Sequence, residues 1–114
     1  MPCIQTKVSV PIPAETEEKL KTRFGKAIAL LPGKSEEWLM LTFEDNCRLY
    51  FQGKKEPGAA FVAVKLYGKA GNGAYDALTK ELTAIVSEEL RIRPDRIYIQ
   101  YEETDHWGWN GGNF

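Results

Sequence analysis

The chain has 114 residues, of which 43% are hydrophobic and 27% charged, a composition typical of one globular domain of common size. Its 15 lysine and arginine residues are balanced by 16 aspartate and glutamate residues, so no basic surface favours a nucleic acid or an anionic membrane as partner. Two cysteines and one histidine are too few for a disulfide framework or a histidine-based zinc cluster, and we expect no cofactor and no metal.

The N-terminal stretch MPCIQTKV lacks the basic and apolar regions of a secretory signal. No apolar run approaches the roughly 20 residues that a membrane span requires. Together with the few cysteines, these features predict a cytoplasmic protein, with secretion by a route that needs no signal peptide left open.

The first half of the chain predicts a strand, a helix and two further strands. Residues 2–10 alternate between the two faces of a strand, and Pro11 ends the pattern. Residues 14–31 predict a helix that Pro32-Gly33 ends, because the apolar positions form one stripe at Leu20, Phe24, Ala27, Ile28 and Leu31. We expect strands at 37–43 and 48–51 after it.

The second half repeats this order. Residues 60–67 predict a strand, and the glycine-rich residues 68–73 predict a turn in which Asn72 caps the next helix. The apolar stripe of that helix is Tyr75, Leu78, Leu82, Ile85, Val86 and Leu90. A strand at 95–102 follows, and the closing stretch HWGWNGGNF predicts a turn with a short strand.

A shift of roughly 58 residues superposes the two halves, which indicates an internal β-α-β pseudo-repeat within one domain spanning residues 1–114, with halves of about 1–56 and 57–114. Right-handed crossovers make each pair of long strands parallel. The sequence therefore predicts a fold of tandem β-α-β units (α/β, in the broader α+β class). It has a four-stranded mixed sheet and both helices on one face. The other face is left bare, so we expect it to be buried against further subunits.

Several familiar chemical motifs are absent or have a simpler interpretation. His106 has no nucleophile elbow to serve, and GKAGNG lacks the spacing of a phosphate-binding loop, so a plain helix-entry turn is the better interpretation. The acidic run from Glu102 to Asp105 is typical of a solvated loop. Cys3 is best interpreted as a small thiol packed in the protein interior.

Pro2 can be interpreted in two ways. The simpler interpretation is that it only ends a strand at the edge of the sheet. A small second residue normally allows the initiator methionine to be removed, which would leave Pro2 with a secondary amine that can act as a base. An ordinary α-amino group has a pKa near 7.7–8.0. Burial and a nearby cation such as Lys34 would lower that pKa and leave the amine uncharged at neutral pH.

The start MP, the segment LPGKSEEWLM, the GK after the third long strand, the stretch RPDRIYI and the closing GWNGGNF occur together in this order. In this combination the whole chain resembles the macrophage migration inhibitory factor family of the tautomerase superfamily. The resemblance implies a homotrimer with the sheets around a central channel, and it agrees with the pseudo-repeat. It also implies a host or cell-surface receptor as partner.

The resemblance also implies site residues. Pro2 corresponds to the catalytic proline, and Lys34 to a lysine that binds the substrate carboxylate. Tyr98 and Gln100 stand where the family has a tyrosine and an asparagine contributed across the subunit boundary, and Trp109 corresponds to a tryptophan at the pocket mouth. Tyr67 and Trp107 replace aliphatic residues of familiar members, which makes the pocket more aromatic.

These residues indicate a keto-enol tautomerase for phenylpyruvate-like aromatic 2-keto acids, an isomerase of the intramolecular oxidoreductase class. The alternative is a cytokine-like signalling protein that binds a receptor and retains a vestigial pocket. A hydratase or dehalogenase would need further arginines around the proline, and the sequence offers no such set. The segment EPGAAF lacks the Cys-x-x-Cys of better-known vertebrate members, so we expect no thiol–disulfide oxidoreductase activity.

Overall fold

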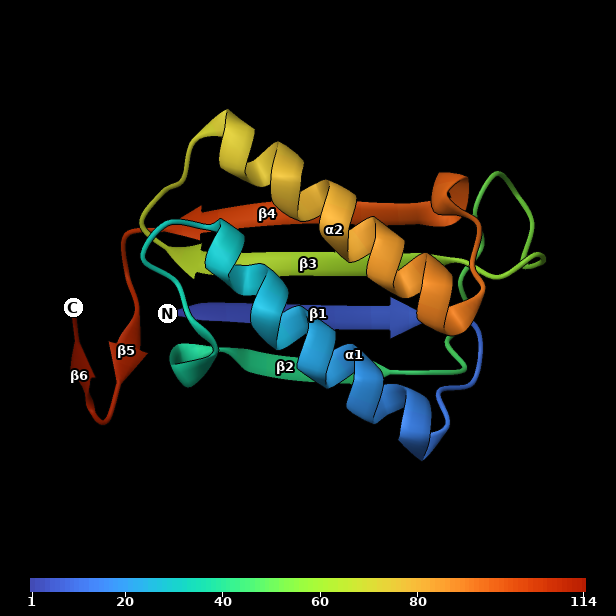
Figure 1. The fold of residues 1–114 in the computed structure, drawn as a ribbon, viewed down its shortest axis with the longest axis horizontal. Coiled ribbons are helices and arrows are strands. Elements are labelled where there is room, and N and C mark those ends of the chain that lie inside the picture. The colour runs from blue at the N-terminus through green and yellow to red at the C-terminus, as the bar shows by residue number, and fades with distance from the viewer.

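One four-stranded sheet takes two strands from each half of the chain (Figure 1). In the computed structural model, which describes residues 1–114, the strands are β1 (Pro2–Val8), β2 (Met40–Glu44), β3 (Ala60–Tyr67) and β4 (Ile97–Thr104), in the spatial order β2-β1-β3-β4. β1 is parallel to β2, β3 is parallel to β4, and the two pairs meet where β1 and β3 run antiparallel. The expected mixed sheet is confirmed.

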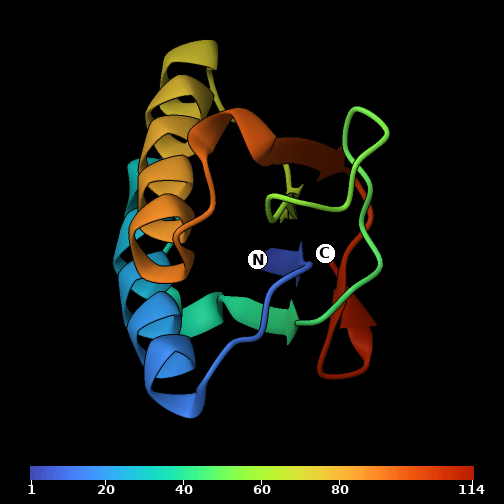
Figure 2. The same ribbon diagram turned by 90° about the vertical axis from the view of Figure 1, so that its right-hand side faces the viewer.

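Both helices cover the same face of this sheet, as Figure 2 shows from the side. They are α1 (Ala14–Ala27) and α2 (Asn72–Leu90). Their apolar stripes pack against the inward side chains of the strands to form one core. Its fully buried members include Ile4, Val8, Leu20, Phe24, Ile28, Val62, Val64, Leu66, Leu78, Leu82, Ile85 and Val86. Neither helix reaches the length and apolarity that a membrane-spanning segment requires.

Three short 3₁₀ turns make the boundaries of the helices and strands differ from those predicted. The first helix ends at Ala27 and tightens into η1 (Ile28–Leu30), because Pro32 holds Leu31 in an extended conformation. The strand expected at 37–43 begins only at Met40 and is preceded by η2 (Glu36–Trp38). Met40 is the register partner of Cys3, and since β1 begins at Pro2, the residues before Met40 have almost no neighbouring strand to pair with.

The second half needs similar corrections. The strand expected at 95–102 runs over β4 and is preceded by η3 (Pro94–Arg96), whose proline suits the first turn of a helix. Asn72 is the first residue of α2 rather than its cap, and the residue at the cap position is Gly71. The free amide of Ala70 is satisfied instead by the hydroxyl of Tyr75.

The prediction of a strand at 48–51 is wrong for a single chain, in which no strand forms there. Only an isolated bridge between Phe51 and Lys54 forms there, because no strand edge of the same chain lies alongside to supply hydrogen bonds. The long connection from β2 to β3 instead folds back at one end of the sheet. The C-terminal hairpin of β5 (Gly108–Trp109) and β6 (Gly112–Asn113) lies at the other end, near the N-terminus (Figure 1).

The face of the sheet opposite the helices is bare, as expected. Its central hollow of about 410 Å³ is lined mainly by polar side chains, namely Gln5, Lys7, Leu49, Phe61, Ala63, Lys65, Gln100 and Glu102. Tyr98, which lies on the same face, is 57% exposed.

Thr6 is the buried polar side chain of β1 on the core face, and its hydroxyl has no hydrogen-bond partner. We expect Thr6→Val, which keeps the shape and removes the unpaired hydroxyl, to raise the free energy of unfolding by about 1 kcal/mol. Urea denaturation at fixed protein concentration measures the change. Thr79→Val is the matched control, because the Thr79 hydroxyl bonds the Tyr101 hydroxyl at 2.8 Å and its loss should destabilise the fold. A destabilised Thr6→Val protein would contradict the interpretation.

Candidate active site

The N-terminus of the chain is built into the sheet. Pro2 is the first residue of β1 and is buried, a position at which the missing N–H of proline leaves no gap in the ladder. It lies opposite Leu66 of β3 in the antiparallel register. The carbonyl of Met1 extends this pairing by accepting a hydrogen bond of 3.3 Å from the amide of Tyr67.

The side chain of Lys34 also reaches the N-terminal end of β1, from the turn that follows η1. The sequence LPGK forms a tight turn in which the amide of Lys34 donates to the carbonyl of Leu31 at 3.0 Å. Gly33 has a φ of 77°, and with Pro32 before it the geometry is that of a type II turn. The turn directs the half-buried Lys34 side chain onto β3, where its ammonium donates to the carbonyl of Tyr67 at 3.0 Å.

The electrostatics at the N-terminus follow from this contact. Burial, and then the charge and hydrogen bond of the Lys34 ammonium, lower the pKa of the Met1 α-amino group below its ordinary value. With Met1 attached, the nitrogen of Pro2 is an amide and Met1 carries the amine. An amine at this end of β1 therefore has surroundings that favour its uncharged form.

A cleft of about 530 Å³ opens beside Pro2. Its wall is mainly aromatic and apolar, and comprises Met1, Pro2, Cys3, Glu37, Trp38, Leu39, Met40, Trp107, Gly108 and Trp109. The rings of Trp38 and Trp109 meet edge-on with their centroids 5.1 Å apart, so the η2 turn and the C-terminal hairpin support each other. Three indole rings lining one cleft can hold a flat aromatic ligand by stacking.

Trp38 lines the cleft but is not among the site residues that the sequence predicts. It lies within the strand predicted at 37–43, in which alternate side chains point to opposite faces, so the sequence offers no link between it and Trp109. A local signal existed: Ser35 followed by Glu36 and Glu37 is typical of a helix start, and a short helical turn would have pointed away from a strand assignment.

The remaining residues near the cleft have clear packing roles. The ring of Tyr67 lies 5.5 Å from that of Phe114, whose amide donates to the carbonyl of Trp107 at 3.0 Å. These contacts hold the C-terminus close to the N-terminal end of the sheet. Burial raises the pKa of the Cys3 thiol, so the thiol stays protonated, as expected for a packed cysteine.

Tyr98 and Gln100 do not meet Pro2 within one chain. In the register of the sheet Tyr98 lies opposite Phe61, whereas Pro2 lies opposite Leu66, five positions away on β3. At the rise per residue of a strand, these five positions separate Tyr98 from Pro2 by about 17 Å along the sheet. Tyr98 lines a hollow with Leu49 and Phe51, and Gln100 lines the hollow of the bare face. Within one chain Tyr98 therefore lies toward one end of the sheet and Gln100 near its middle, and neither lines the cleft beside Pro2.

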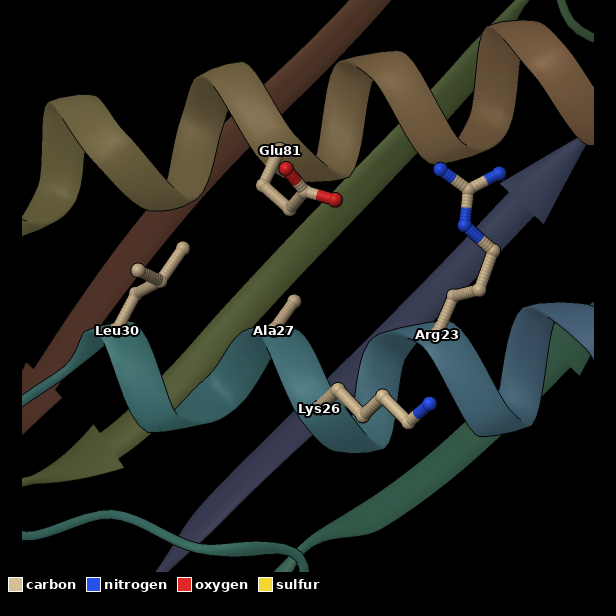
Figure 3. A pocket seen from close by; sticks show the side chains of 5 residues that line it. All are labelled: Arg23, Lys26, Ala27, Leu30 and Glu81. Atoms are coloured by element: carbon tan, nitrogen blue, oxygen red, sulfur yellow. The ribbon is translucent and has the colours of Figure 1, made fainter.

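A further hollow lies away from the sheet, between the two helices (Figure 3). It has a volume of about 390 Å³ and is lined by Arg23, Lys26, Ala27, Leu30 and Glu81. Arg23 is engaged in ion pairs with Glu88 at 2.9 Å and Glu89 at 3.0 Å, which join α1 to α2. No three histidine, cysteine or acidic side chains come together in a way that could hold a metal ion.

Comparison with known proteins agrees with this geometry. The whole chain, residues 1–114, matches the family described as macrophage migration inhibitory factor. The macrophage migration inhibitory factor of Meriones unguiculatus is 28% identical over 116 residues, covering 100% of this chain and 99% of that protein. The crystal structure of Leishmania major MIF2 is 34% identical with a TM-score of 0.93, covering 100% of this chain and 97% of that one.

The structure of a macrophage migration inhibitory factor homologue from Prochlorococcus marinus is 30% identical, with a TM-score of 0.88 and 98% of each chain covered. The chain therefore belongs to the macrophage migration inhibitory factor family, within the tautomerase superfamily.

Gly33 is the residue on which the placing of Lys34 depends. We expect Gly33→Ala to lower the free energy of unfolding by about 1 kcal/mol, because a Cβ is disfavoured at the left-handed φ of this turn although no atom lies in its way. Thermal or urea unfolding measures the loss. Gly73→Ala in the first turn of α2 is the control: it too meets no neighbouring atom and has no left-handed φ, so it should be neutral or stabilising. Equal effects of the two changes would refute the assigned role of the turn.

Proposed function

We propose that the protein is a keto-enol tautomerase acting on phenylpyruvate-like aromatic 2-keto acids, with the amine of Pro2 as general base once Met1 has been removed. Membership of the family supports an isomerase of the tautomerase kind. The observation that carries the proposal is the meeting of three features at one point: a buried Pro2, the Lys34 ammonium, and a cleft lined by tryptophans.

The proposed reaction moves one proton within the substrate. The lone pair on the nitrogen of Pro2 accepts a proton from the carbon next to the carbonyl, the C–H electrons form the C=C bond, and the C=O π electrons move to oxygen. The protonated amine of Pro2 then gives this proton to the oxygen, which yields the enol and restores the uncharged base. The reverse direction returns the proton from Pro2 to carbon. Lys34 binds the substrate carboxylate and keeps the amine uncharged, so that it is able to accept a proton at neutral pH.

The aromatic wall would bind the ring of the substrate. Of the expected binding residues, Trp107 and Trp109 line the cleft, and Trp38 joins them because it packs edge-on against Trp109. Tyr67 is not part of this lining and packs against Phe114, so its proposed contribution is to support the C-terminal segment. Offset or edge-on stacking of a phenyl ring on indole gives both affinity and orientation. This wall supports a preference for aromatic over aliphatic keto acids.

Tyr98 and Gln100 would complete the site from a second copy of the chain in a homotrimer. The separation of these residues from Pro2 within one chain requires a neighbour for them to act, and the bare sheet face with an exposed Tyr98 offers a surface for one. In that arrangement each cleft would receive one tyrosine and one glutamine able to hydrogen-bond the substrate carbonyl or a ring substituent.

Light scattering tests the assembly. We expect a mass of three chains at micromolar concentration, because the bare face combines exposed aromatic and polar groups that a neighbouring subunit would bury. A stable monomer at that concentration would rule out the shared site.

The catalytic test compares three proteins: wild type with Met1 shown absent by mass spectrometry, Pro2→Gly prepared in the same way, and a wild-type sample that retains Met1. Ultraviolet absorbance follows the loss of the phenylpyruvate enol. We expect the second and third samples to be at least about 100-fold slower than the first, the usual contribution of a general base. If the Met1-free protein does not exceed the uncatalysed rate, the enzyme proposal fails and the cytokine-like alternative is favoured.

The pH dependence tests the role of Lys34. Activity requires the uncharged amine, so it should rise as the pH passes upward through the pKa of the Pro2 nitrogen. Since the Lys34 cation disfavours the protonated amine, Lys34→Ala should raise that pKa and move the rise in kcat/KM to higher pH. The loss of the carboxylate contact should also raise KM roughly 10- to 100-fold.

Lys26→Ala is the matched control for Lys34→Ala. It removes the same charge from an exposed position on α1 (Figure 3), and Lys26 is not among the residues that line the cleft. Its pH profile and KM should equal those of the wild type. An unshifted profile for Lys34→Ala would refute the role of the Lys34 charge in setting the pKa of the base.

A further inference from the structure

Arg96 is a buried cation that the proposed mechanism does not use. It is the last residue of η3, directly before β4, and is only 5% exposed. It forms no ion pair with an acidic side chain. A buried charge without such a partner must be stabilised by hydrogen bonds, and the residues that supply them show what the side chain holds in place.

The guanidinium of Arg96 binds three backbone carbonyls of a single segment. Its Nε donates to Gly58 at 3.1 Å, its Nη1 to Phe51 at 3.1 Å and its Nη2 to Lys54 at 2.9 Å. These residues belong to the connection between β2 and β3, which has no helix or strand of its own. The planar fork of arginine is suited to such a set of fixed acceptors, and lysine cannot reproduce it.

The same guanidinium lies over the ring of Phe51, 5.3 Å from its centroid. Phe51 in turn meets the ring of Tyr98 edge-on, with centroids 5.1 Å apart and ring planes at 86°. Tyr98 is 57% exposed and stands on the bare face of the sheet. A continuous series of contacts therefore runs from a buried charge, through Phe51, to an exposed phenol two residues further along the chain.

We propose that Arg96 and Phe51 are positioning residues that fix the orientation of the Tyr98 ring for the active site of the neighbouring subunit. This inference rests on the proposed function, in which Tyr98 contacts the substrate across the subunit boundary. Arg96 holds the backbone and the ring of Phe51, and Phe51 forms a wall that restricts the rotation of Tyr98. Preorganising an exposed aromatic side chain in this way lowers the entropy lost when it binds a ligand.

The kinetic test uses Phe51→Leu, which leaves Arg96 and its carbonyl contacts in place. We expect KM for the phenylpyruvate enol to rise about 3- to 10-fold with kcat changed less than about 2-fold, because the support affects substrate binding rather than proton transfer. Phe43→Leu is the matched control: Phe43 packs against Phe24 under the helices and lies far from Tyr98. Its KM should not change.

A double-mutant cycle separates positioning from general damage. In a Tyr98→Ala background, Phe51→Leu should add less than about 1.5-fold to KM, because the ring that Phe51 supports is already gone. An unchanged KM for Phe51→Leu alone, or an equal rise in both backgrounds, would overturn the inference.

A spectroscopic readout keeps the inference testable if the proposed function fails. Fluorine NMR of protein labelled with 3-fluorotyrosine, with the Tyr98 signal assigned from Tyr98→Phe, reports on the ring directly. Phe51→Leu and Arg96→Lys should shift or broaden this signal, whereas Phe43→Leu should not. An inactive Met1-free wild type would refute the proposed function alone, and an unmoved Tyr98 signal in Phe51→Leu would refute the positioning role whatever the activity.

Discussion

The proposed chemistry of this protein depends on the hydrogen bond from the Lys34 ammonium to the Tyr67 carbonyl. This hydrogen bond fixes a cation beside the first strand, and that cation and the burial of the N-terminus together favour an uncharged amine there. The contact requires both the LPGK turn, which directs the lysine, and the antiparallel pairing of β1 with β3, which brings the end of β3 next to the start of β1. Local turn geometry and long-range strand pairing thus act at one point.

The two ends of the sheet are built differently. At one end the N-terminus, the η2 turn and the C-terminal hairpin surround the tryptophan-lined cleft, and at the other end the β2–β3 connection packs beside the start of β4 (Figure 1). The two ends hold their cations differently. Lys34 is half-buried and has one carbonyl partner, so it can also bind a carboxylate, whereas the three carbonyl partners of Arg96 suit it to holding backbone in place.

Much of the fold could be predicted because its signals are local. The stripes that begin at Leu20 and Leu78 determine which helix faces are buried, and the alternation in β1 and β3 determines the strands, since both patterns reflect only the geometry of the backbone. The boundaries were less accurate. Met40 begins β2 because Cys3 is there to pair with it, and residues 48–51 form no strand because nothing pairs with them, and neither fact is written in the local sequence.

The sequence by itself determined the layered α+β architecture, the buried proline at the start of a strand and the lysine in its turn, because each follows from periodicity, turn chemistry or a motif of fixed spacing. Only the tertiary structure decided that Trp38 faces Trp109 and that Tyr98 lies far from Pro2 within the chain. It also decided that Arg96 donates hydrogen bonds to the β2–β3 connection. The contacts among these join residues between 38 and 71 positions apart, and the separation of Tyr98 from Pro2 follows from a register across three strands. Such neighbours are chosen by the packing of the whole sheet and not by any local preference of the chain.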